Sequence, residues 1–262
     1  DTNSVYQYTL STAWDISTAV YASKSFDFTT QDITPHDVFF KPDGTTMYMI
    51  GQTGDNVYEY SLSTAWDVST ASYVRLFYVG SEATSPTGLF FKPDGTKMYI
   101  TGTSGDAVDE YTLSTAWNIS TASHLTVFPV SSQEPNPESV VFTPDGTKMF
   151  IVGQTKDAIF EYSLSTAWAV STASYVTGFT VALEESLPKG LFLKPDGTKM
   201  YVTGTGSDNI TEYDVTSATS ITLPASVQNL PKEAAVSDAK IAYTFVTTDG
   251  GTTVTLINEE VL

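Results

Sequence analysis

Four side chains of different chemistry occupy one equivalent position of a repeated sequence. Each follows a proline, and each is 51 residues from the next: His36, Thr87, Glu138 and Lys189. If the repeats stand around an axis, these residues ring the mouth of a central channel, where they can contact a ligand. Asp37 adjoins the first of them. We therefore treat this set as candidate ligand-binding residues, because copies of one repeat that differ at a single spot indicate either selection there or freedom in a surface loop.

Carboxylates near the same positions suggest a second kind of chemistry. A glycoside hydrolase needs a general acid and a partner carboxylate separated by roughly 5 to 9.5 Å. The acidic residues available for this are Asp32, Asp37, Glu134, Glu138, Glu184 and Glu185. However, the loops are short and the repeats are nearly uniform. No serine elbow or metal-spaced cluster accompanies the two histidines, His36 and His124. We therefore predict no catalytic residues, no metal and no cofactor, and keep a carbohydrate-active hydrolase as an alternative.

Four tryptophans form a second candidate site. Each lies in a copy of a Ser-Thr-Ala-Trp segment: Trp14, Trp66, Trp117 and Trp168. Large aromatic side chains usually pack into the protein, here into a groove between repeats. The functional alternative is a sugar-stacking platform on each repeat. Both interpretations stay open, and the tryptophans join the candidate ligand-binding set.

The elements that must position these residues come from the repeat itself. Pro-Asp-Gly (PDG) turns recur every 51 residues, with their aspartates at Asp43, Asp94, Asp145 and Asp196. Each unit reads as four short strands separated by Gly, Pro and Asp signals, and the aspartates are turn formers. The second strand, such as 96–102, is apolar on both faces, which is typical of small sheets packed face to face. A period near 50 with this pattern predicts an all-β protein, a β-propeller of four-stranded antiparallel blades.

The number of blades follows from counting strand motifs. Complete copies of the first two strands begin near Pro35, Pro86, Pro137 and Pro188, whereas the third-strand motif occurs five times. The segment 240–260 resembles a decayed copy of the first two strands. We therefore predict a single five-bladed domain over residues 1–262, closed by pairing these C-terminal strands with N-terminal strands at 5–10 and about 20–28. The alternative is four blades followed by a C-terminal β module.

Composition limits the partners. The formal net charge is −18, with 12 basic residues among 262, which argues against nucleic acid or an anionic membrane as a partner. The chain has no cysteine, which excludes disulfides and thiolate metal sites. No apolar run is long enough to cross a bilayer, so we expect no membrane insertion. A low proportion of charged residues and abundant Ser and Thr favour an extracellular β-rich protein.

The stretch LFFKPDGTKMYITGTSGDAVDEYTLSTAWNISTAS carries a resemblance. Its PDG-turn unit resembles YVTN-like β-propeller repeats. The added STAW segment resembles repeats of marine phage and bacterial proteins, some of them tail or fibre components. The resemblance implies a non-catalytic binding module in a virion or outside a cell. Its partners would be a glycan or cell-surface receptor and other subunits of the assembly; a purely structural spacer is the alternative.

Overall fold

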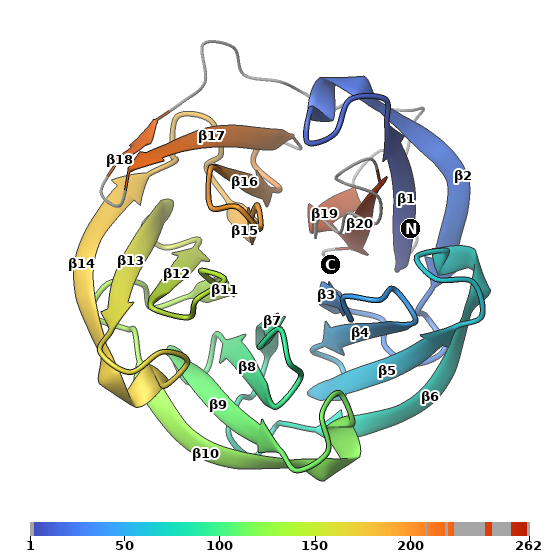
Figure 1. Cartoon of the computed structure of the whole chain (residues 1–262), viewed down its shortest axis with the longest axis horizontal. Helices are drawn as coiled ribbons and strands as arrows, with labels where there is room; N and C mark the ends of the chain where they lie inside the picture. The colour runs from blue at the N-terminus through green and yellow to red at the C-terminus, as the bar shows by residue number, and fades with distance from the viewer. Residues whose placement is uncertain (1–2, 208, 218–219, 223–238, 243–252, 261–262) are drawn as a thin grey trace.

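The strands form four-stranded antiparallel sheets arranged around an axis (Figure 1). This computed structural model describes residues 3–207, 209–217, 220–222, 239–242 and 253–260. In each sheet the first strand lies nearest the axis and the fourth lies outermost. Four sheets are each built from four consecutive strands. The first contains β3 (Pro35–Phe40), β4 (Thr46–Gly51), β5 (Asn56–Leu62) and β6 (Ala71–Tyr78), and the second contains β7 (Pro86–Phe91), β8 (Lys97–Gly102), β9 (Ala107–Leu113) and β10 (Ala122–Pro129). The third contains β11 (Pro137–Phe142), β12 (Lys148–Gly153), β13 (Ala158–Leu164) and β14 (Ala173–Thr180), and the fourth contains β15 (Pro188–Leu193), β16 (Lys199–Gly204), β17 (Ile210–Ser217) and β18 (Ser220–Thr222).

A further sheet combines strands from the two ends of the chain. Its order is β19 (Ala239–Ala242), β20 (Thr253–Glu260), β1 (Ser4–Leu10) and β2 (Ala19–Asp27). Strands β1 and β20 pair in antiparallel register from Ser4 opposite Asn258 to Thr9 opposite Thr253. The prediction of an all-β propeller with four-stranded antiparallel blades is therefore confirmed. Residues 243–252, within the segment 240–260 that was predicted to repeat the first two strands, lie outside the described residues.

The PDG turns connect the first and second strands because their residues suit a tight reversal. In the second of these sheets Asp94 accepts hydrogen bonds from the Thr96 amide and hydroxyl, and Gly95 has a φ of 72° that only glycine adopts without strain. A β-bulge follows the proline that begins each complete first strand, as between Pro35 and Asp37. The bulge places an extra residue at the start of the strand, next to the loop that precedes it.

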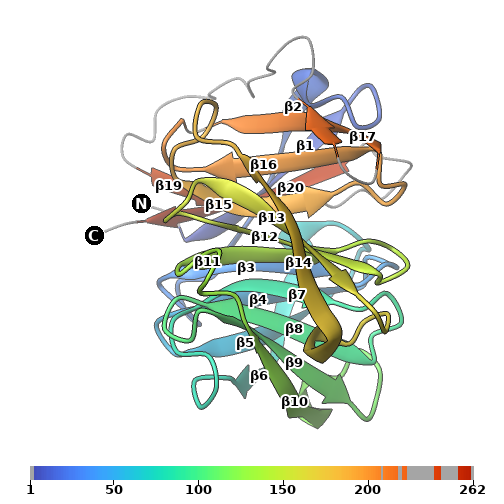
Figure 2. The same cartoon turned by 90° about the vertical axis from the view of Figure 1, so that its left-hand side faces the viewer.

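The hydrophobic core lies between neighbouring sheets (Figure 2 shows the stacked strands from the side). One cluster joins Tyr48 and Ile50 of one sheet to Leu89 and Phe91 of the next. Both faces of a second strand are buried, as Tyr99 and Ile100 illustrate. This arrangement confirms the expectation that the inner strands are covered on both faces. No helix in the described part of the chain is long and apolar enough to span a bilayer.

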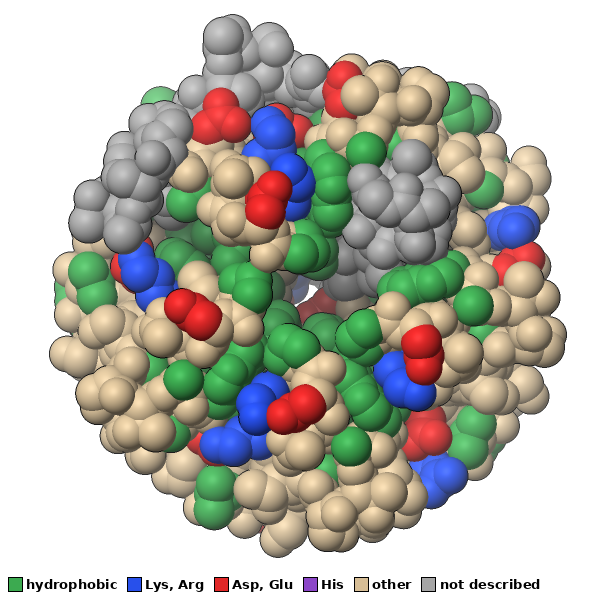
Figure 3. Space-filling view, viewed as in Figure 1, with side chains coloured by type: hydrophobic (Ala, Val, Ile, Leu, Met, Phe, Trp, Pro, Cys, Tyr) green, Lys and Arg blue, Asp and Glu red, His purple; other side chains and the backbone are tan. Residues whose placement is uncertain are grey.

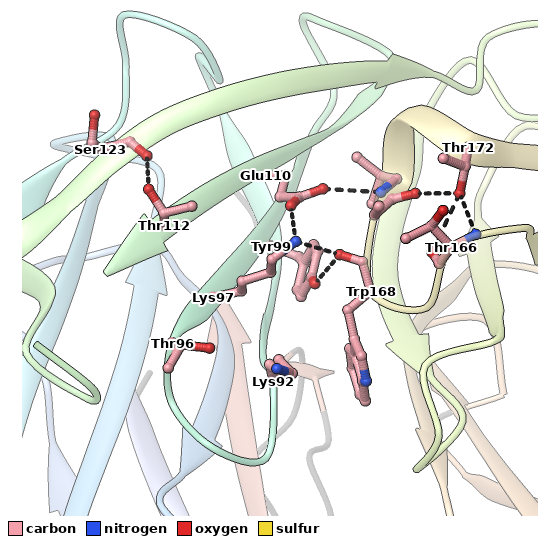
Figure 4. Close-up of polar contacts among 12 residues, drawn as sticks. Lys92, Thr96, Lys97, Tyr99, Glu110, Thr112, Ser123, Thr166, Trp168 and Thr172 are labelled. Atoms are coloured by element: carbon pink, nitrogen blue, oxygen red, sulfur yellow. Dashed lines mark hydrogen bonds and ion pairs between the residues drawn. The ribbon is translucent and has the colours of Figure 1, made fainter. Parts of the chain in front are cut away.

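The STAW segments connect the third and fourth strands and hold neighbouring blades together. Each ends in a short 3-10 helix: η1 (Ile16–Thr18), η2 (Val68–Thr70), η3 (Ile119–Thr121) and η4 (Val170–Thr172). Figure 4 shows the contact between the blade of strands β7 to β10 and the blade of strands β11 to β14. The buried Glu110 accepts hydrogen bonds from Lys97 and from the Val170 amide, and Tyr99 donates to the Trp168 carbonyl at 2.8 Å. A buried carboxylate needs such partners, because each unmet bond costs roughly 1–3 kcal/mol or more.

Candidate site at one end of the channel

Three of the predicted residues converge at one end of the channel. They come from the first strands of three different blades, at the bulged position after the proline. The Lys189 Nζ lies 3.1 Å from Oε1 of Glu138, and Nδ1 of His36 lies 3.9 Å from Oε2 of the same carboxylate. The side chains of His36 and Glu138 are each 5% exposed and that of Lys189 is 10% exposed. We call His36, Glu138 and Lys189 the polar cluster.

The position of these strands explains the convergence. Strands β3 and β11 belong to blades that are not neighbours, so their side chains meet only by pointing toward the axis (Figure 1). Thr87, the equivalent residue of the intervening blade, is short and turns its hydroxyl to the Pro137 carbonyl at 2.7 Å. The small threonine thus leaves room for the longer side chains on either side. A carboxylate between an imidazole and an ammonium can orient a proton acceptor and stabilise developing charge.

The other two members of the predicted channel set hold first strands to one another. Thr87 ties its strand to β11, as described above. Asp37 accepts hydrogen bonds from the Val38 amide at 2.8 Å and from the Leu89 amide of the next blade at 2.9 Å. Both residues therefore contribute to the positions of the strands that carry the polar cluster.

Three of the four remaining carboxylates considered for hydrolytic chemistry accept hydrogen bonds from backbone amides. Glu134 accepts from the amides of Asn136, Thr155 and Lys156. Asp32 and Glu185 occupy the equivalent position and are bound in the same way, and all three are at most 2% exposed. They fix the loop before the first strand to the turn between the second and third strands. Glu184 instead accepts from the Tyr213 hydroxyl at 3.5 Å.

An apolar ring of side chains was not predicted. Three residues after each member of the polar cluster or Thr87, the first strands carry Phe39, Phe90, Val141 and Phe192. The three phenylalanines are partly exposed, and the rings of Phe39 and Phe90 lie 5.4 Å apart. We call these four residues the collar. Figure 3 shows hydrophobic side chains around a narrow central opening, with an acidic side chain visible below it. The sequence did not show that the phenylalanines are partly exposed, because their neighbours in the first strands are apolar as well.

The four tryptophans pack within the protein. Trp14, Trp66, Trp117 and Trp168 each stack on an aromatic residue of a first strand, with ring centroids 5.5 to 6.2 Å apart. The ring of Trp66 lies so close to Gly44 that a Cβ there would be 2.3 Å from Cδ1 of the indole. This is the packing alternative of the sequence prediction. Among the described residues, no group of three or more His, Asp or Glu side chains could hold a metal ion.

The comparison with protein families decides the classification. Residues 4–237 match the family described as lactonase, seven-bladed β-propeller. The chain belongs to this lactonase family. No curated protein matches the lactonase-family chain. The family description counts seven blades, whereas the described strands of this member form five sheets.

Solved structures show the same fold at low sequence identity. A putative 6-phosphogluconolactonase of Bacteroides fragilis is 15% identical, with a TM-score of 0.53, over 75% of this chain and 56% of that one. The periplasmic gluconolactonase of Pseudomonas aeruginosa is 16% identical, with a TM-score of 0.50, over 74% and 54%. A Lactobacillus plantarum protein is 15% identical, with a TM-score of 0.53, over 94% and 74%. The lactonase-family chain thus spans little more than half the length of the first of these structures.

Membership of the family corrects the functional prediction. The expectation of a non-catalytic module that binds a glycan or cell-surface ligand, and of a chain that is not an enzyme, was wrong, because the family is one of lactonases. The prediction failed because nearly uniform blades were taken to exclude an asymmetric pocket. The polar cluster obtains its asymmetry from one position that differs in every repeat. The expected partners and the location outside a cell or in a virion stay predictions.

Proposed function

We propose that this chain hydrolyses a lactone at the polar cluster. The observation that carries the proposal is the convergence of His36, Glu138 and Lys189 from three blades, in a chain of the lactonase family. His36 acts as the general base that takes a proton from water, and the Glu138 carboxylate, 3.9 Å away, stabilises the imidazolium that forms. Lys189 stabilises the negative charge that develops on the carbonyl oxygen.

The reaction balances without a cofactor. The oxygen of water forms a bond to the lactone carbonyl carbon, the bond from that carbon to the ring oxygen breaks, and the ring oxygen receives the proton. The product is a hydroxy acid that ionises at neutral pH. Each turnover therefore releases one proton to solution, which gives a direct assay.

The charge of the site favours a neutral lactone over a phosphorylated one. The innermost strands of the five sheets carry two Lys or Arg residues, Lys189 in β15 and Lys240 in β19, and Lys189 is already paired with Glu138. A phosphate group is usually bound by several cationic or backbone donors. The net charge of −18 also repels an anionic substrate.

The test measures proton release from glucono-δ-lactone, γ-butyrolactone and a 6-phospho sugar lactone at constant pH. We expect hydrolysis of the two neutral lactones above the spontaneous rate. His36→Gln, Glu138→Gln and Lys189→Met should each lower kcat by about 100-fold or more.

Matched controls use the same residue types away from the channel. His124→Gln and Lys148→Met change side chains that pair with Asp109 and Glu161 within their own blades, and both variants should keep the native rate. Spontaneous rates for all three lactones, or equal loss in the His36 and His124 variants, would overturn the proposal.

We further propose that the ring has five blades, closed by the shared sheet of β19, β20, β1 and β2. Support comes from the antiparallel register in which Tyr8 lies opposite Val254. A Tyr8→Cys/Val254→Cys variant should form a disulfide on oxidation and unfold at a higher temperature than its reduced form. Tyr8→Cys/Glu259→Cys is the out-of-register control. Equal cross-linking of both pairs would contradict this closure.

A further inference from the structure

The channel combines the polar cluster with an apolar collar in line along the same strands. Each collar position lies three positions after its cluster position, as Phe39 does after His36, which corresponds to about 10 Å along a strand. Figure 3 shows hydrophobic side chains bordering the central opening, with an acidic side chain below them. An apolar surface with a few polar groups at one end is the usual composition of a small-molecule site.

We propose that the substrate is a lactone that carries an unbranched alkyl chain, with the ring at the polar cluster and the chain within the collar. This inference rests on the proposed function and names its substrate class. A sugar lactone has a hydroxyl on nearly every carbon, and the collar side chains Phe39, Phe90, Val141 and Phe192 offer those hydroxyls no hydrogen-bond partner. An alkyl chain loses nothing by leaving water, and its burial there is favourable.

Val141 gives the collar its asymmetry. The equivalent residues of the other three blades are phenylalanines, and all three are partly exposed, whereas Val141 is 5% exposed. Valine is shorter than phenylalanine, and the partly buried Phe90 packs against the core cluster that contains Val141. Strand β11 also carries Glu138, three residues before Val141. A chain attached to a lactone bound at Glu138 therefore runs toward the smallest of the four collar side chains.

The first experiment compares kcat/KM for γ-butyrolactone, γ-octalactone and γ-decalactone with the native protein. Each methylene group that enters the collar should raise kcat/KM by up to about fourfold, the factor expected for full burial of a methylene group. Hydrolysis of butyrolactone with no gain for the longer lactones would overturn the alkyl-chain proposal and leave the lactonase proposal standing.

The second experiment enlarges the smallest collar side chain with Val141→Phe. The substitution introduces the residue that three other blades carry at this position, so the fold has a precedent for it. We expect kcat/KM for γ-decalactone to fall at least tenfold while that for γ-butyrolactone stays within twofold. Val127→Phe is the control, because Val127 is 50% exposed on the outer strand β10. Equal effects of the two variants, or no effect of Val141→Phe, would contradict the collar's role.

A third measurement separates chain binding from hydrolysis. Cyclopentanone and 2-hexylcyclopentanone have the carbonyl of a lactone but no ring oxygen, so they cannot be hydrolysed. The hexyl compound should bind at least tenfold more tightly by calorimetry, and Val141→Phe should remove that difference. If no lactone is hydrolysed but the difference is found, the lactonase proposal fails and the apolar subsite stands; equal affinities overturn the subsite.

Discussion

At the scale of single residues, a tyrosine of the second strand forms a hydrogen bond to the following blade. Tyr48, Tyr99 and Tyr201 donate hydroxyl hydrogen bonds to the carbonyl of the tryptophan in the following blade: Trp117, Trp168 and Trp14. The fourth equivalent is Phe150, and the blade after it has Thr219 where the others have tryptophan. Among these four blades, the hydroxyl is thus present where the following blade has a tryptophan and absent where it does not.

Removing one of these hydroxyls should destabilise the fold modestly. In Tyr201→Phe the Trp14 carbonyl loses a donor at 2.9 Å, which should cost about 1 kcal/mol and lower Tm by about 2 °C for a chain of this size. Thermal unfolding followed by circular dichroism measures it. Tyr73→Phe is the control, because Tyr73 is 43% exposed. Equal Tm values for the two variants would count against the inter-blade bond.

The residues of the candidate site were only partly predictable from the sequence. Because they occupy the same position of the repeat, we predicted that His36, Glu138 and Lys189 lie at one end of the channel. The structure brings these side chains together. Their chemistry was not predicted, because no local motif joins residues from three repeats. The collar was missed because Phe39 and its equivalents lie between core residues, and exposure toward a channel has no signature in a single strand.

At the scale of elements, the 3-10 helices differ in how they begin. Asp67 caps η2 by accepting from the Ser69 amide, and it also pairs with Lys24 of the preceding blade at 2.8 Å. In η4 the capping position is Ala169, which has no side-chain bond, and the residue equivalent to Lys24 is Thr126. The cap and its cation are therefore both absent at the same junction.

Restoring the missing cap should stabilise the protein. We expect Ala169→Asp to add about 0.5–1 kcal/mol to the free energy of unfolding, and Thr126→Lys to add a further few tenths only in combination with Ala169→Asp. Urea unfolding of the two single variants and the double variant forms the required cycle. A gain from Thr126→Lys alone as large as in the double variant would contradict the pairing.

The elements themselves were predictable for physical reasons. The PDG turn forces a reversal through a glycine with positive φ, and apolar residues on both faces require a sheet on each side. These local constraints recur at a fixed interval, so they specify a blade. The role of the STAW segment depended on contacts with the next blade, such as the bond between Glu110 and the Val170 amide. Such a contact joins residues 60 positions apart and has no local signal.

At the scale of the whole molecule, the repeated turns give the fold a common response to acid. Partial burial raises the pKa of Asp94, but hydrogen bonds from Lys92 and Thr96 outweigh it and lower the pKa to about 2. Asp43 and Asp196 are in the same situation, with pKa values of about 2. Because folding lowers these values, the carboxylates stabilise the fold above the unfolded pKa of about 4 and lose that effect as pH falls toward 2.

The combined variant Asp43→Asn/Asp94→Asn/Asp196→Asn should be less stable than the native protein at pH 7. The difference between their free energies of unfolding should be constant from pH 5 to 8 and shrink between pH 4 and 2, as measured by urea unfolding at each pH. It should be small, because these side chains are about half exposed and solvent screens the pairs. A difference that is unchanged down to pH 2 would show that the turns gain nothing from their charge.

The pairing of β1 with β20 also affects how the protein is made. Ser4 to Thr9 leave the ribosome early, but their partners Thr253 to Asn258 are synthesised only after all the intervening blades. Until then the edge of β1 that β20 will cover offers unpaired backbone groups to any other extended chain. Joining segments so distant in sequence is intrinsically slow, so we expect the nascent chain to be most exposed to aggregation before β1 and β20 pair.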